Sequence, residues 1–253
     1  MHHISLSKDE NISMNLTVDI GNYLTKVAIF DDLQQIVHNA VFHWLDTNTA
    51  AALLNTYHID AAIVSSVQKS GRILLDYLRE HCATVVRMGC STPLPMVVHY
   101  SRQTLGCDRL AAAIGAGAIL PNSNVLVVDS GTCITYDLLT ATGEYMGGNI
   151  APGLQMRLDA MRHYTKRLPH VDTEKPLVLL GTDTQEALHG GAYWGIVNEI
   201  EGYYKMLQQQ YTPLTVALTG GNSKILSSNL LCPHKIEPNL VHIGLNRILQ
   251  YSL

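Results

Sequence analysis

Apolar runs and segments of helical periodicity alternate along the chain from residue 15 onwards. The first three runs are short and strand-like, and a glycine-containing turn separates the first two. Apolar residues at helical spacing then alternate with short buried runs, and two prolines at 92–96 predict a loop. In the first half the pattern predicts strands at 15–20, 24–30, 35–43, 61–67 and 83–88, and helices at 50–58, 70–82 and 104–120.

The second half repeats this order of elements. Its first three runs predict another meander, and amphipathic segments with a further apolar strand follow it. The last strand ends in a glycine turn, after which two short elements precede a C-terminal helix. The predicted strands are 124–129, 132–139, 144–153 and 214–221, and the predicted helices are 154–168, 184–210 and 239–252.

The two halves share a turn of the form V-D-x-G-[NT]. Its aspartates are Asp19 and Asp129, which lie 110 positions apart (129 − 19). In each half the turn falls between the first and second predicted strands, which indicates a tandem duplication with a cleft between the copies. We place the boundary near 121–123, so the predicted domains are 14–121 and 122–253, after a flexible polar leader at 1–13.

Composition narrows the class of protein. A hydrophobic fraction of 47% in 253 residues is ample for a buried core, and a net charge of −4 gives no basic footprint for nucleic acid. The five cysteines show no C-x-x-C spacing, which is typical of reduced thiols in a cytoplasmic protein. The longest apolar stretch, 110–120, is too short to span a bilayer, so we expect no membrane partner.

The repeated turns have the residue types that phosphate and cation binding require. Glycine lets a phosphate approach backbone N–H groups closely, and Asn22 or Thr132 can donate a hydrogen bond. The carboxylates of Asp19 and Asp129 can hold an accompanying cation, since hard cations prefer oxygen ligands. Lys26 can reach a phosphate as a point charge. The alternative is that both turns simply make hairpins.

A third group of residues lies at 105–113, "LGCDRLAAA". Asp108 and Arg109 are adjacent in the first turn of a predicted helix, where they can cap the helix and pair with surface charge. The run of small apolar residues that follows also allows a different interpretation, in which the helix begins at the edge of a cleft and continues into the protein core. There Asp108 can accept a proton from a substrate hydroxyl, and the planar fork of Arg109 can clamp a substrate carboxylate.

Taken in order, these motifs resemble the type III pantothenate kinases of the acetate and sugar kinase, Hsp70 and actin superfamily. The resemblance covers nearly all of residues 14–253. The matching segments are "DIGNYLTK" (19–26), "LGCDR" (105–109), "DSGT" (129–132), "GGNIAPGL" (147–154), "GTDTQEALHGG" (181–191) and "LTGG" (218–221).

This resemblance implies two ribonuclease H-like domains, with mixed sheets flanked by helices and an ATP cleft between them. It also implies ATP-dependent phosphorylation of pantothenate to 4'-phosphopantothenate, the first step of coenzyme A biosynthesis, with Mg²⁺ and a monovalent cation (K⁺ or NH₄⁺). Asp108 would be the general base. The implied ATP-binding residues are Asp19, Ile20, Gly21, Asn22, Tyr23, Leu24, Thr25, Lys26 and Thr132.

The same resemblance assigns Asp129 to the monovalent cation. It also implies a homodimer that completes the substrate pocket across its interface. The implied pantothenate-binding residues are Tyr100, Gly106, Cys107, Asp108, Arg109 and Thr184. The helix at 184–210 is predicted to lie at the dimer interface, because its glycines permit close approach and Tyr193 and Trp194 add contact area. The alternative is that this helix belongs to the core of its own chain.

One position departs from the family pattern. Tyr23 replaces the small hydroxyl residue that usually follows D-x-G-N, which removes a compact phosphate donor and adds bulk. Two other functions are compatible with these residues. One is a different small-molecule kinase of the superfamily. The other is a catalytically silent regulatory or accessory protein, which predicts lost carboxylates, whereas Asp19, Asp108 and Asp129 are all present.

Overall fold

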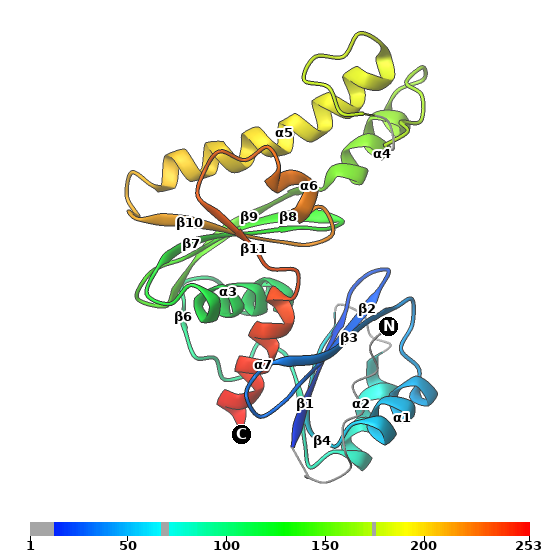
Figure 1. Cartoon of the computed structure of the whole chain (residues 1–253), viewed down its shortest axis with the longest axis vertical. Helices are drawn as coiled ribbons and strands as arrows, with labels where there is room; N and C mark the ends of the chain where they lie inside the picture. Colours follow the sequence, from blue (N-terminus) through cyan, green and yellow to red (C-terminus); the bar gives the residue numbers. More distant parts are fainter. Residues whose placement is uncertain (1–12, 67–70, 174–175) are drawn as a thin grey trace. The chain divides into compact units, whose positions relative to one another are not determined.

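The computed structural model describes residues 13–66, 71–173 and 176–253 (Figure 1). Residues 1–12 of the predicted leader lie outside the described residues. The same is true of the last position of the predicted strand 61–67 and of the first position of the predicted helix 70–82. The chain forms two compact units. Unit 1 contains Met1–Pro93 and Leu245–Leu253, and unit 2 contains Leu94–Gly244.

Unit 1 contains a five-stranded sheet in the order β3-β2-β1-β4-β5. The first three strands are antiparallel neighbours, whereas β4 runs parallel to β1 and β5 runs parallel to β4. Alternate residues of β1, including Leu16 and Val18, pack in one cluster with Leu74 and Leu78 of α2. The elements are β1 (Met14–Ile20), β2 (Thr25–Phe30), β3 (Ile36–Phe42), α1 (Thr47–Thr56), β4 (Ile59–Ser66), α2 (Arg72–His81) and β5 (Thr84–Arg87).

Unit 2 contains a six-stranded sheet in the order β11-β10-β7-β8-β9-β6. Its strands are β6 (Val97–Val98), β7 (Asn124–Ser130), β8 (Cys133–Leu139), β9 (Glu144–Pro152), β10 (Leu214–Thr219) and β11 (His234–Ile236). Its helices are α3 (Cys107–Ile119), α4 (Leu154–Tyr164), α5 (Thr184–Leu207) and α6 (Ser223–Ser227), and α7 (Leu240–Ser252) begins in this unit and ends in unit 1.

Helices cover both faces of the second sheet (Figure 1). Leu126 and Val128 of β7 belong to the cluster that contains the buried residues of α4 and α5. Val125 and Val127 belong to a different cluster, with Ala112 and other residues of α3. A strand buried on both sides needs apolar side chains at every position, which explains why β7 reads as a continuous apolar run.

The strand orders confirm the predicted duplication. The first sheet has the order β3-β2-β1-β4-β5. The second sheet, read from the third strand of its meander and without the edge strand β6, has the order β9-β8-β7-β10-β11, which matches the first position by position. In each unit an antiparallel meander is followed by two parallel strands. The mixed α/β class is confirmed too. The predicted domain boundary at 121–123 stays a prediction, because the two compact units divide the chain elsewhere, and they group α3 with the second sheet.

Several element ends differ from the prediction for local reasons. Helix α1 begins at Thr47 instead of residue 50, because the Asp46 carboxylate caps it by accepting from the Thr49 N–H at 2.7 Å. Helix α4 ends at Tyr164 instead of residue 168, where the backbone becomes extended at Thr165. Strand β6 is absent from the prediction, since it is a two-residue edge strand beside a proline-rich loop.

In the part of the chain that the structure describes, no helix has both the length and the apolar character needed to cross a membrane.

Candidate active site

The first Asp-x-Gly turn joins β1 to β2 in unit 1. The Gly21 N–H donates to the Leu24 carbonyl at 3.0 Å, which closes a hairpin loop. Asp19 and Lys26 are directly paired across the two strands, so their side chains lie on the same face of the sheet. This pairing brings together a carboxylate and an ammonium group, the two charged groups predicted for Mg²⁺ and phosphate.

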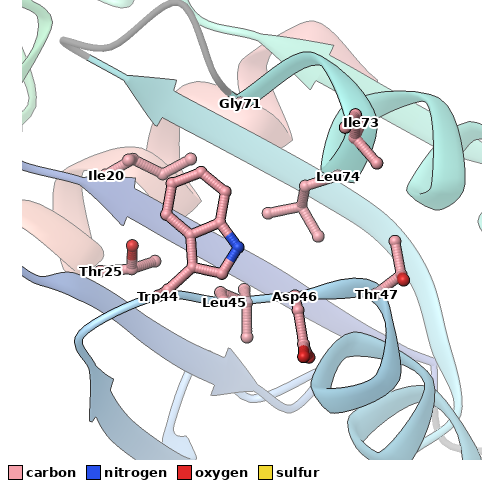
Figure 2. A pocket seen from close by; sticks show the side chains of 9 residues that line it. All are labelled: Ile20, Thr25, Trp44, Leu45, Asp46, Thr47, Gly71, Ile73 and Leu74. Carbon is pink, nitrogen blue, oxygen red and sulfur yellow. The ribbon is translucent and has the colours of Figure 1, made fainter.

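Two other residues predicted to bind ATP point the other way. Ile20 and Thr25 form the next pair in the register, so their side chains lie on the opposite face from Asp19 and Lys26. There they line a pocket of about 210 Å³ with Trp44, Leu74 and other residues (Figure 2). A ligand on the Asp19 face of the hairpin can therefore meet these two residues only through their backbone.

The remaining residues of the first turn face solvent. Asn22 is exposed, Tyr23 keeps 73% of its surface accessible, and Leu24 keeps 39%. The bulk of Tyr23 therefore does not fill space inside unit 1. The Tyr23 side chain extends into solvent, and the family pattern has a small hydroxyl residue at this position.

The second Asp-x-Gly turn joins β7 to β8 in unit 2, and two other motifs pack against it. The Gly153 N–H donates to the Thr132 carbonyl at 3.1 Å, and the Asn222 N–H donates to the Ser130 carbonyl at 3.2 Å. Segments that are remote in sequence, "PG" at 152–153 and "TGG" at 219–221, therefore meet at residues 129–132. Three of the six resembling motifs form one cluster within this unit.

Glycine is required at both of these contacts. Gly220 has a φ of +88°, and a Cβ there would lie 2.5 Å from the Asp129 Oδ1 and from the Ser130 carbonyl oxygen. A Cβ at Gly153 would overlap the carbonyl oxygens of Gly131 and Thr132. The close approach of these backbones is the physical reason for the glycines of both motifs.

The third group of predicted residues lies at the start of α3. Gly106 is the N-cap, and Cys107, Asp108 and Arg109 form the first turn of the helix. Asp108 is half-buried, and its Oδ1 accepts the Arg109 N–H at 2.9 Å. A Cβ at Gly106 would overlap that same oxygen, so glycine leaves room for the carboxylate. The Asp108 carboxylate is thus held at the N-terminus of α3, where the helix dipole favours negative charge.

Arg109 is buried, with 5% of its surface exposed, so pairing with surface charge is the wrong reading for this residue. Its Nη2 donates to Asp137 Oδ1 at 2.5 Å, and its Nε lies 3.1 and 3.2 Å from the two carboxylate oxygens. Burial lowers the pKa of Arg109, but the hydrogen bonds and charge of Asp137 outweigh it and raise that pKa overall. The guanidinium is therefore charged inside the unit.

Tyr100, also predicted to bind substrate, lies beside Arg109. Its ring centroid is 5.6 Å from the guanidinium carbon, a cation–π distance. It also makes an edge-to-face contact with Tyr145, with centroids 6.4 Å apart. Tyr100 keeps 38% of its surface exposed. The contacting residues Asp137, Arg109 and Tyr100 therefore extend from the buried ion pair to solvent.

The glycines of the "GGNIAPGL" motif make room for these side chains on the face of the sheet that α3 covers. Gly148 of β9 is paired with Asp137 of β8, and a Cβ on it would overlap both the Asp137 carboxylate and the Arg109 guanidinium. Gly147 has a φ of +123°, which favours glycine, whereas a Cβ on it would make only an ordinary contact with the Tyr100 ring at 3.6 Å. Strand β9 therefore presents a bare backbone to the candidate substrate residues.

Thr184 is not brought to this group within one chain. It is exposed and begins α5, which packs on the face of the sheet opposite α3. Asp183 caps the helix through the Glu186 N–H at 2.9 Å, while Glu186 accepts from the Thr182 N–H at 2.8 Å. The local sequence around Thr184 thus serves to start the helix and leaves its hydroxyl at the surface.

Sequence reasoning missed Asp137 and Tyr145. Asp137 is fully buried in β8, and the Tyr145 hydroxyl donates to its Oδ1 at 2.5 Å. Burial and the neighbouring carboxylate raise the pKa of Tyr145, which keeps this hydroxyl a donor. The available signal was a single aspartate inside an otherwise apolar strand, "CITYDLL", since a buried carboxylate requires a partner.

The chain is similar over most of its length to known proteins. Residues 15–206 match the family model described as type III pantothenate kinase. A type III pantothenate kinase from Bacteroides fragilis is 38% identical over 242 residues, covering 94% of this chain and 98% of the relative. One from Porphyromonas gingivalis (strain W83) is 37% identical over 245 residues, covering 96% and 100%.

The solved structures share the fold. A Campylobacter jejuni protein described as a Baf family transcriptional activator superposes with a TM-score of 0.62 at 19% identity, covering 93% of this chain and 98% of that one. At this identity the likeness concerns architecture alone. The family model, the full-length relatives and the ordered motifs together establish that the chain belongs to the type III pantothenate kinase family.

Proposed function

We propose that this chain transfers the γ-phosphoryl group of ATP to the hydroxyl of pantothenate, forming 4'-phosphopantothenate for coenzyme A biosynthesis. The observation that carries the proposal is 38% identity to a type III pantothenate kinase over 94% of the chain, with all three motif carboxylates present. The five cysteines are all free thiols, which supports a cytoplasmic location.

In this proposal Asp108 is the general base. Phosphoryl transfer depends mainly on positioning and charge neutralisation, but the attacking hydroxyl must still lose its proton. The Asp108 carboxylate is half-buried at the N-terminus of α3, a position from which it can accept a proton from a substrate hydroxyl. Asp19 is the next candidate for this role.

Arg109 binds the carboxylate of pantothenate in the same proposal, while Tyr100 and the backbone of 106–108 line the pocket. The buried guanidinium is charged and lies beside the exposed edge of Tyr100. An arginine in that position recognises a carboxylate by charge and by its planar fork. Thr184 would then contact pantothenate from a second copy of the chain.

The ATP-binding residues are proposed to be 19–26 in unit 1 and Thr132 in unit 2. Asp19 and Lys26, which share one face of their sheet, supply an oxygen ligand for Mg²⁺ and a positive charge for phosphate. Mg²⁺ would neutralise charge on the phosphates when bound. The backbone of the turn presents N–H groups, and Tyr23 supplies no compact hydroxyl.

The residues around Asp129 fit a monovalent cation. The donors there are oxygens, namely the Asp129 carboxylate and the carbonyls of the turn, and Gly220 packs against that carboxylate without a side chain. Among the described residues no three His, Cys, Asp or Glu side chains group as a site for a more demanding metal. Asp129 would hold K⁺ or NH₄⁺ and so fix the phosphate geometry.

The helix at 184–210 is still proposed to lie at or near the homodimer interface, but Tyr193 and Trp194 do not supply its contact area. Tyr193 is fully buried and donates to the Ile225 carbonyl, and Trp194 donates to the Val178 carbonyl, so both belong to their own chain. Unit 2 has exposed apolar side chains on several elements, and among them we propose Ile150 of β9, which is 61% exposed, and Met156 of α4, which is 37% exposed, as interface contacts. Light scattering should give the mass of two chains, and Ile150→Glu should give one.

The function is tested with an ATP-coupled assay of the folded chain, supplied with pantothenate or with a panel of sugars, in K⁺ and in Na⁺ buffers. Turnover with pantothenate and none with sugars is expected. Turnover with a sugar instead would favour another kinase of the superfamily. A folded chain without turnover on any substrate would favour the catalytically silent reading.

A further inference from the structure

The proposed carboxylate-binding arginine is held by a second buried residue. The Asp137 carboxylate occupies the edge of the Arg109 guanidinium formed by Nε and Nη2, with its shortest contact at 2.5 Å. Because the guanidinium is planar, this contact fixes the plane of the group and turns its Nη1 edge away from Asp137. The orientation of Arg109 is thus set by a residue 28 positions later in the chain.

Asp137 is itself fixed and closed off from substrate. It has no exposed surface, it lies on the middle strand of the β7-β8-β9 meander, and the Tyr145 hydroxyl donates to it. Across the strand, Gly148 leaves the space that the carboxylate and the guanidinium occupy together. Asp137 therefore cannot touch pantothenate and can act on it only through Arg109.

We infer that Asp137 is the positioning residue for pantothenate capture, holding Arg109 so that its Nη1 edge meets the substrate carboxylate. The inference rests on the proposed function, specifically on the role of Arg109. Asp137 also balances the arginine's charge, because a lone buried guanidinium is costly and would leave the position that the pair now fixes.

Removing the Asp137 charge has two opposing effects on the binding of a substrate carboxylate. Loss of the anchor weakens binding of a substrate carboxylate, because Arg109 must be ordered again each time substrate binds. Loss of a negative charge near the site strengthens binding of the same carboxylate by leaving the arginine uncompensated. The inference holds that the first effect prevails, because three close contacts set the position of Arg109.

The test is Asp137→Asn, which keeps the shape of the side chain and removes its charge. Its kinetics are measured with pantothenate and with panthenol, in which an alcohol replaces the carboxylate. The KM for pantothenate should rise about tenfold, the value of one charged hydrogen bond, while the KM for ATP and the kinetics with panthenol change little. The preference for the carboxylate should therefore fall about tenfold. This ratio is independent of how much of the sample is folded.

A matched control lies on the other face of the same sheet. There Arg157 Nη2 donates to Glu199 Oε2 at 2.6 Å, and the Tyr136 hydroxyl donates to the same oxygen at 2.8 Å. Glu199→Gln removes the charge from this second arginine, carboxylate and tyrosine group. It should lower the melting temperature without changing the pantothenate to panthenol preference. An equal loss of preference in this variant would overturn the inference.

Arg109→Lys separates failure of the inference from failure of the proposed role. One outcome is that Arg109→Lys loses the preference for pantothenate, while Asp137→Asn keeps it or has a lower KM for pantothenate. In that case the positioning role of Asp137 is wrong, and the role of Arg109 in binding the substrate carboxylate stands. If Arg109→Lys keeps the preference, both are wrong. In the double variant Asp137→Asn should add nothing further, because it acts only through Arg109.

Should Asp137→Asn fail to fold, Tyr145→Phe decides. This variant leaves both charges in place and removes the hydrogen bond that fixes Asp137. The preference for pantothenate should fall about threefold, as expected for one neutral-donor hydrogen bond. An unchanged preference in well-folded Tyr145→Phe would overturn the inference.

Discussion

The two Asp-x-Gly turns share a sequence pattern and a place between the first two strands of their sheets, but their surroundings differ. The first is a loop of residues 21–24 whose closing hydrogen bond joins Gly21 to Leu24, and Tyr23 extends into solvent. The second is a two-residue connection whose backbone accepts hydrogen bonds from Gly153 and Asn222. The two units share the hairpin connection, but the segments that pack against the second turn have no described counterpart at the first.

This difference assigns different physical tasks to the two turns. The second turn is built into unit 2 by glycines that only fit without side chains, so its geometry is preorganised. The side chains of the first turn face solvent, so we propose that ATP meets this turn as an exposed loop. Substitutions in the second turn should therefore affect folding and catalysis together, whereas those in the first should affect mainly ATP binding.

The largest effect is expected at the aspartate of the second turn. Asp129→Ala removes the proposed cation ligand, so kcat should fall by at least about 10²-fold and the dependence on K⁺ should disappear. The measurement is the rate over a K⁺ titration at saturating ATP. A variant with a normal K⁺ response would contradict the assignment of Asp129 to the cation.

A smaller effect is expected at Gly220, whose backbone touches the second turn. Gly220→Ala combines a φ of +88° with a Cβ only 2.5 Å from Asp129 Oδ1, so the free energy of unfolding should fall by about 2–3 kcal/mol. Urea denaturation measures this loss, and the KM for ATP should rise in the same variant.

Gly143→Ala is the matched control for that prediction. Gly143 has a similar φ of +79°, but a Cβ there meets no atom within 4 Å. It should lose only about 1 kcal/mol from the backbone conformation and keep its KM for ATP. Equal losses in the two variants would mean that the contact with the second turn contributes nothing.

The smallest effect is expected at Tyr23 in the first turn. Because 73% of its surface is exposed, Tyr23→Thr should change the free energy of unfolding by less than about 0.5 kcal/mol. It restores a compact hydroxyl donor, so the KM for ATP should fall about threefold, as one hydrogen bond would give. A large change in melting temperature would show that the first turn is packed as tightly as the second.

The fold was largely predictable because its signals are local. The apolar run of β7 and the helical spacing of α2 identify their elements, and the repeated Asp-x-Gly turns indicate the duplication. The strand register shows that Ile20 and Thr25 point away from Asp19, and the period of two along a strand could have predicted this.

The inner part of the site was not predictable in the same way. Asp137 meets Arg109 only because β8 pairs with β9 and α3 covers that face, and these contacts join segments remote in sequence. The glycines of the "GGNIAPGL" motif were visible as a signature, but their physical reason is the space that Gly148 leaves for this ion pair. Which side chain a glycine accommodates depends on tertiary packing that a single sequence does not contain.

The proposed reaction is the phosphorylation of pantothenate with Asp108 as the base. The most direct measurement is the rate of phosphopantothenate formation from Mg-ATP in K⁺ buffer, for the natural chain and for Asp108→Asn. Product is expected with the natural chain, and kcat should be lower by about 10²- to 10⁴-fold in the variant, with ATP binding little changed. Absence of product from the folded natural chain, or a near-normal kcat in the variant, would contradict it.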